Sequence, residues 1–123
     1  MTYTATPRDG AGKAAVMHER RGAAIADAVG VDVVPGTLNV MLNRPFDWAG
    51  AKVVPMPDAV SWSALDGPWL TSTARIKRVE VGGVEAWALR MERSRAPDRL
   101  LELVAPVRLR DAITSWPAPL EVS

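Results

Sequence analysis

Hydrophobic and polar residues alternate along much of the chain, which is the pattern of strands with one buried and one exposed face. Runs of this kind are expected to form strands at residues 2–6, 37–42, 70–81, 84–93, 100–104 and 120–122. One further short strand is expected between residues 50 and 55. The rest of the segment 43–69 is rich in Pro, Trp, Asp and Gly and is expected to be irregular. The pattern therefore predicts five to seven strands.

Helical periodicity replaces this alternation in one long segment. Within residues 14–29, Ile25 is one of several apolar residues that can share one side of a helix, and Gly30 suits the position just after its end. A second helix is expected at residues 107–113, because Pro106 fits the start of a first helical turn. We therefore expect one main helix and one short helix.

Two turns link the expected elements. Gly82 and Gly83 separate two alternating runs, which indicates a hairpin because glycine readily adopts the positive φ angles of a two-residue turn. Pro35 and Gly36 form a second turn pair. A chain of 123 residues suffices for one domain, which we expect to comprise residues 1–123. Mostly antiparallel strands with one main helix predict a small β-barrel with a helix packed on it.

Composition excludes several classes of protein and of metal site. Apolar residues make up 48% of the chain and charged residues 24%, as in ordinary globular proteins. There is no cysteine, and His18 is the single histidine, so thiolate and multi-histidine zinc sites are excluded. Any metal is expected to be a hard cation held by oxygen atoms, such as Mg²⁺. No membrane span or secretory signal is visible, so a cytoplasmic location is the default expectation.

Charge is distributed unevenly although the net charge is only +1. Residues 75–110 contain nine Lys or Arg and five Asp or Glu, a net charge of +4, which leaves −3 for the remainder. A locally basic half suits an anionic ligand such as a phosphate compound, and a solvated surface of mixed charge is the alternative. The small net charge and the lack of a basic helix argue against nucleic acid as the partner.

A glycine-containing loop is expected at residues 7–12, between the first strand and the main helix. Glycine allows the backbone to approach a phosphate, and a helix N-terminus offers unpaired N–H groups. The loop is not a P-loop, because Pro7 stands where that motif has its first glycine and Ala14 replaces its Ser or Thr. A plain connecting turn therefore remains the alternative for Gly10, Ala11, Gly12 and Lys13.

Two strand positions carry further candidate chemistry. Thr37 and Asn39 are two residues apart, so both side chains point to one face and offer hard oxygen donors to a cation such as Mg²⁺. Glu102 is the single charge within an apolar strand, where it is able to bind polar ligand groups or accept a proton. The alternative in both cases is a polar side chain on an exposed strand face.

The order of the motifs resembles that of a known family. The runs PGTLN at residues 35–39 and LELVAPVRLR at residues 101–110, with the Gly-Gly hairpin at residues 82–83, resemble the archaeal-type CTP-dependent riboflavin kinase family. The resemblance implies a six-stranded cradle-loop β-barrel. It also implies an enzyme that transfers the γ-phosphate of CTP to the 5′-hydroxyl of riboflavin, giving FMN and CDP.

The resemblance also assigns roles to residues. It implies Thr37 and Asn39 as Mg²⁺ ligands, Glu102 as a flavin-binding and catalytic residue, and Ser94 as a second flavin contact. Contacts with CTP are implied for two segments: Gly10, Ala11, Gly12 and Lys13, and Val107, Arg108, Leu109 and Arg110. The partners expected are thus CTP and riboflavin or FMN, without nucleic acid or membrane. A flavin- or nucleotide-binding barrel without catalytic activity is the alternative.

The chain departs from the family pattern in the glycine loop and after the hairpin. Ala14 stands at the third loop glycine and Ala15 at the aromatic residue that usually follows. Arg95 and Ala96 occupy the place of a common polar-aromatic pair.

Overall fold

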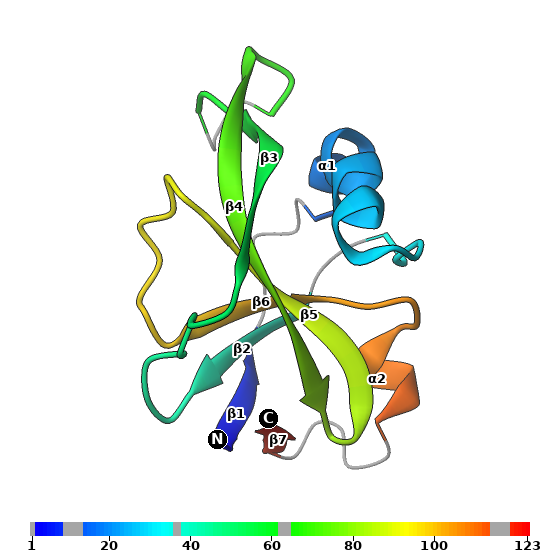
Figure 1. Ribbon diagram of the computed structural model, residues 1–123, viewed down its shortest axis with the longest axis vertical. Coiled ribbons are helices and arrows are strands. Elements are labelled where there is room, and N and C mark those ends of the chain that lie inside the picture. Colours follow the sequence, from blue (N-terminus) through cyan, green and yellow to red (C-terminus); the bar gives the residue numbers. More distant parts are fainter. Residues whose placement is uncertain (1, 9–13, 36–37, 62–64, 114–118) are drawn as a thin grey trace.

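The structure is a computed structural model that describes residues 2–8, 14–35, 38–61, 65–113 and 119–123 (Figure 1). In this part of the chain, seven strands and two helices follow one another in the order β1 (Tyr3–Arg8), α1 (Ala14–Val29), β2 (Leu38–Leu42), β3 (Lys52–Ala59), β4 (Trp69–Val81), β5 (Val84–Met91), β6 (Leu100–Val104), α2 (Leu109–Ala112) and β7 (Leu120–Val122).

The seven strands form one antiparallel sheet in the order β3-β4-β5-β6-β2-β1-β7. A further pairing of β4 with β7 closes six of these strands into a ring, with Val81 opposite Val122. Next to this pair, Glu80 and Ser123 exchange two backbone hydrogen bonds of 2.9 and 3.0 Å. The seventh strand, β3, pairs with β4 outside the ring, and the two form the hairpin that projects at the top of Figure 1. The predicted mostly β, antiparallel architecture with one main and one short helix is confirmed.

Among the described residues, the two largest hydrophobic cores lie on the two faces of this sheet. All six ring strands contribute to the first core, and α2 adds Leu109 to it. The second core joins the opposite face of β3, β4, β5 and β6 to α1, which contributes Ile25. In Figure 1, α1 lies beside the projecting β3–β4 hairpin. The face of the sheet that packs against α1 is therefore distinct from the face that lines the interior of the ring.

Local signals place several elements where they are expected. The helix α1 covers the predicted residues 14–29, and Gly30 ends it with a φ of 82° and a 2.8 Å hydrogen bond from its N–H to the carbonyl of Ala26. Gly82 and Gly83 form the predicted hairpin with φ angles of 55° and 83°, so both adopt the left-handed conformation of the two-residue turn.

The structure differs from expectation at the first strand and at β3. The loop expected at residues 7–12 is wrong at its start, because Pro7 and Arg8 belong to β1 and pair with β2. The short strand expected between residues 50 and 55 is instead Lys52–Ala59, and it runs through Pro55 and Pro57. Proline is tolerated because β3 is the outer strand of the sheet, where N–H groups on one side have no ladder partner to lose.

Two other elements are shorter than expected. β5 ends at Met91 instead of continuing to residue 93, because the chain turns there with a hydrogen bond from the N–H of Ser94 to the carbonyl of Met91. The short helix begins at Leu109 and not at residue 107, since Arg108 has an extended backbone. In the described parts of the chain, neither helix has the length and the apolar character needed to cross a membrane.

Candidate functional site

A row of four residues crosses the sheet on the face whose core includes α1. Arg8 of β1 opposes Asn39 of β2, Asn39 opposes Glu102 of β6, and Glu102 opposes Leu89 of β5. Directly opposite residues of antiparallel strands share one face, with Cβ atoms about 5 Å apart. Leu89 belongs to the core packed against α1, so the whole row faces that side of the sheet. We call these four residues the cross-strand row.

The row brings together two residues that the sequence singled out separately. Asn39, a predicted metal ligand, and Glu102, a predicted flavin-binding and catalytic residue, are both half-buried. Leu101 and Leu103 enter the core inside the ring, which turns Glu102 to the other face. The amide and carboxylate oxygens are hard donors, so they suit Mg²⁺, which is usually held by one or two protein groups with waters and phosphates. Thr37, the other predicted ligand, lies outside the described residues.

A buried ion pair lies close to this row and joins α1 to β3. The side chain of Arg21 donates hydrogen bonds of 2.9 Å from Nη2 to Oδ1 of Asp58 and from Nε to the carbonyl of Pro57. Arg21 is 3% exposed and Asp58 is 9% exposed. Burial lowers the pKa of the Arg21 guanidinium from its ordinary value, and the negative charges of Glu102 and Asp58 oppose that change. Residues of α1, β3 and β6 are thus electrostatically linked.

The turn after β5 approaches the same ion pair. Arg93 Nη1 lies 3.7 Å from the second carboxylate oxygen of Asp58 and 3.5 Å from the carbonyl of Ala59. The neighbouring Ser94, a predicted flavin contact, is half-buried, and its hydroxyl accepts a 3.2 Å hydrogen bond from the N–H of Ala96. The structure therefore holds the Ser94 turn on the side of the sheet where Asp58 and Arg21 meet.

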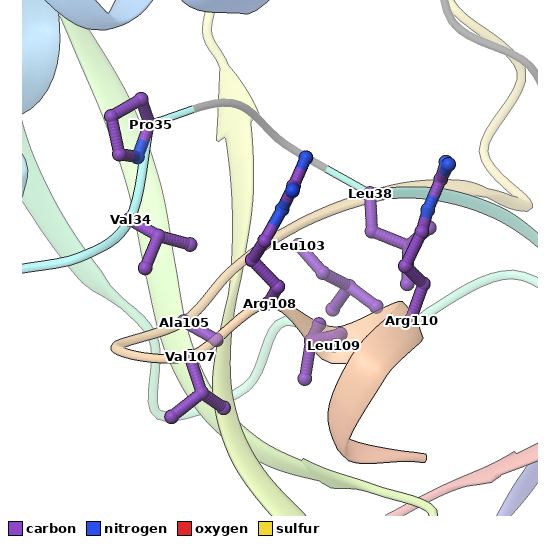
Figure 2. Close-up of a pocket in the computed structure, with 9 residues that line it drawn as sticks. All are labelled: Val34, Pro35, Leu38, Leu103, Ala105, Val107, Arg108, Leu109 and Arg110. Atoms are coloured by element: carbon purple, nitrogen blue, oxygen red, sulfur yellow. The ribbon is translucent and has the colours of Figure 1, made fainter. Parts of the chain in front are cut away.

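A pocket of about 200 Å³ lies at the start of α2. Its lining includes all four residues of the predicted second nucleotide segment, together with Val34, Pro35, Leu38, Leu103 and Ala105. Figure 2 shows the side chains of Arg108 and Arg110 extending in the same direction. Leu109 is buried in the ring core and Val107 is 44% exposed, so the segment offers an apolar wall and two cations. Such a pocket suits a ligand with an apolar part and a negative charge.

The pocket and the cross-strand row meet on the same two strands. Leu38, which lines the pocket, opposes Leu103, and the next pair along the ladder is Asn39 and Glu102. Adjacent pairs point to opposite faces of the sheet, so Asn39 and Glu102 point away from the face on which Leu38 and Leu103 line the pocket. The predicted glycine loop, Gly10, Ala11, Gly12 and Lys13, lies outside the described residues. It connects β1, whose last residue Arg8 belongs to the row, to the start of α1.

Four charged residues near the site were not predicted from the sequence as site residues: Arg8, Arg21, Asp58 and Arg93. One of them left a signal in the sequence. Met17, Arg21 and Ile25 are spaced by four residues on one helical face, and both flanking residues are buried. An arginine on an apolar helical face needs a buried partner, but nothing in the sequence identifies Asp58 as that partner. Among the described residues, no group of three or more acidic or histidine side chains is arranged to hold a metal.

Most of this chain matches the model of a known protein family. The model of the CTP-dependent riboflavin kinase family, described as "Domain of unknown function DUF120", matches residues 9–116. The chain belongs to this family. The family resemblance inferred from the PGTLN and LELVAPVRLR runs is confirmed.

Curated relatives of this family come from archaea. The chain is 34% identical to a riboflavin kinase of Methanocella arvoryzae over 87 residues, which are 71% of this chain and 38% of that protein. It is 32% identical to a riboflavin kinase of Pyrobaculum arsenaticum over 90 residues, covering 73% and 43% of the two chains. It is 30% identical to a riboflavin kinase of Pyrococcus abyssi over 104 residues, covering 85% and 49%. The match thus spans less than half the length of each of these relatives.

Proposed function

We propose that the protein is a riboflavin kinase that transfers the γ-phosphate of CTP to the 5′-hydroxyl of riboflavin, giving FMN and CDP. The observation that carries the proposal is the pairing of Asn39 with Glu102 across β2 and β6, one ladder position from the pair Leu38–Leu103, which lines a pocket with two arginines. Phosphoryl transfer depends mainly on positioning and on neutralising charge, and these groups offer both. The curated relatives are named riboflavin kinases, which supports the same choice of substrate.

The pocket at α2 is the proposed site for the nucleotide. Arg108 and Arg110 would face the anionic part of CTP, while Val107 and Leu109 would contact its base or sugar. Gly10, Ala11, Gly12 and Lys13 would contribute backbone N–H groups to the phosphates. Residues 107–110 resemble the family segment that contacts CTP, so we expect CTP to be preferred over ATP.

Thr37 and Asn39 are the proposed protein ligands of Mg²⁺. A hydroxyl and an amide oxygen form a sparse protein shell, which suits an ion that keeps waters and substrate phosphate oxygens as its other ligands. When bound, the ion would neutralise the charge on the transferring phosphate.

Glu102 and Ser94 are the proposed contacts to riboflavin. The carboxylate of Glu102 would accept a hydrogen bond from the 5′-hydroxyl and orient its oxygen toward the γ-phosphorus. The new bond joins that oxygen to phosphorus, the bond from phosphorus to the bridging oxygen of CDP breaks, and the hydroxyl proton passes to the carboxylate or to water. Little base strength is needed in a loose transition state, so the orientation of the hydroxyl matters more than a raised pKa of the carboxyl. We expect the reaction to take place in the cytoplasm.

The proposal is tested by incubating the protein with riboflavin, Mg²⁺ and CTP, ATP, GTP or UTP in turn, and measuring FMN by chromatography. FMN formed with CTP at the highest rate, and lost on addition of EDTA, is the expected result. Equal rates with ATP would refute the nucleotide preference and leave the kinase activity in place. Flavin binding without FMN from any nucleotide would overturn the kinase in favour of a binding protein.

A further inference from the structure

The buried Arg21 is unusual in a position where an apolar residue would be expected. It lies on the apolar face of α1, between the buried side chains of Met17 and Ile25. A buried ion pair rarely stabilises a fold more than apolar side chains of the same volume, because both charges lose their hydration. Stability alone therefore does not explain why the chain has the ion pair of Arg21 and Asp58 at this position.

The geometry of the guanidinium restricts what that role is. Both hydrogen bonds to β3, to the carbonyl of Pro57 and the carboxylate of Asp58, use Nε and Nη2, which lie on one edge of the planar group. The plane of the guanidinium is thereby fixed relative to β3. Asp58 also lies 3.7 Å from Arg93, in the turn that carries Ser94. Arg21 thus connects α1 to two segments next to the cross-strand row.

Glu102 is the other carboxylate that acts on this cation. Leu89, directly opposite Glu102, shares a core with Ile25, which lies one turn after Arg21 on the buried face of α1. The negative charges of Glu102 and Asp58 both oppose the effect of burial on the pKa of Arg21. Glu102 is half-buried on β6 and faces the side of the sheet that α1 covers. A glutamate side chain rotates about three bonds, so a cation held by β3 on the same side of the sheet limits where its carboxylate lies.

We propose that Arg21, held in place by Asp58 and Pro57, is a positioning residue that fixes the carboxylate of Glu102 in the riboflavin site. This inference rests on the function proposed above, because Glu102 is assigned there to the reacting hydroxyl. A carboxylate displaced by an ångström loses much of its ability to orient a substrate hydroxyl. Changing Arg21 is therefore expected to lower turnover, and to do so mainly when the Glu102 carboxylate is present.

A double-mutant cycle tests this dependence. Arg21→Lys keeps the charge but loses the fixed plane, and we expect it to lower kcat by about tenfold while KM for CTP changes by less than about twofold. In a Glu102→Gln background, the same substitution is expected to lower kcat by less than about threefold, because the group it positions is already altered. Arg20→Lys is the matched control, since Arg20 is the exposed neighbour on α1, and its activity is expected to be that of the wild type.

The outcomes separate the positioning role from the proposed function. If Arg21→Lys lowers kcat by the same factor in the wild-type and the Glu102→Gln backgrounds, the positioning role is overturned while the kinase activity stands. A wild-type protein that makes no FMN would overturn both. If Arg21→Lys does not fold, Asp58→Asn replaces it in the cycle, since it releases the guanidinium while keeping the shape of its partner. If Asp58→Asn also lowers kcat by the same factor with and without Glu102→Gln, the inference is overturned in the same way.

Discussion

The Gly82–Gly83 hairpin allows a quantitative test of how α2 is packed. Both glycines have positive φ, and an L-residue in the left-handed region costs about 1 kcal/mol of folding free energy. A Cβ atom on Gly83 would meet nothing within 4 Å, whereas one on Gly82 would lie 3.3 Å from Cγ2 of Ile113. Ile113 is buried in the ring core directly after α2, so it has little space to move. The added crowding is expected to cost about another 1 kcal/mol.

The expected result is a loss of about 1 kcal/mol for Gly83→Ala and about 2 kcal/mol for Gly82→Ala. Urea denaturation followed by tryptophan fluorescence measures both, with the slope m unchanged. Gly82→Ala combined with Ile113→Val is the control, because removing a methyl group from Ile113 relieves the crowding. This double variant is expected to lose less stability than the sum of the two single substitutions.

Two results would refute this reasoning. Equal losses from the two alanine variants would show that Ile113 does not crowd the turn, and no loss from Gly83→Ala would show that the turn is not left-handed. The difference between the two variants is also expected to affect the proposed nucleotide pocket, since α2 carries Arg110 and follows Arg108. Gly82→Ala is therefore expected to raise KM for CTP more than Gly83→Ala does.

Three further predictions concern the proposed site. Glu102→Gln is expected to lower FMN formation by about tenfold or more, with flavin affinity partly retained in a fluorescence titration and little change in Tm; unchanged turnover would remove Glu102 from the site. Asn39→Ala is expected to raise the Mg²⁺ concentration that gives half-maximal activity, and an unchanged Mg²⁺ titration would argue against Asn39 as a ligand. Arg108→Gln is expected to raise KM for CTP by about tenfold while KM for riboflavin stays constant, and equal changes in both would contradict a separate nucleotide pocket.

Local signals in the sequence were sufficient for much of the fold. The end of α1 depends on Gly30 and the hairpin on Gly82 and Gly83, and each signal acts within a few residues of the structure that it determines. The strand through Pro55 and Pro57 was not predictable in this way. Whether proline is tolerated there depends on β3 lying at the outside of the sheet, which is a property of the whole topology.

The candidate site was predictable only in part, for the same reason. Asn39 and Glu102 were found individually, from residue spacing and from a charge in an apolar run. Their position opposite each other follows from the pairing of β2 with β6, which joins segments far apart in the chain. The partner of Arg21 required the packing of α1 on β3, so the sequence could at most have indicated that a partner exists.

The ladder between β2 and β6 also bears on how this sequence can change during evolution. Main-chain hydrogen bonds hold Asn39 opposite Glu102, and almost any residue at the neighbouring positions is able to make those bonds. Substitutions in the surrounding core thus leave the spacing of the two side chains unchanged. Insertion or deletion of one residue within either strand would instead turn one of the two side chains to the opposite face. Across descendants of this chain, substitutions in β2 and β6 should therefore accumulate while changes in the length of these two strands are eliminated.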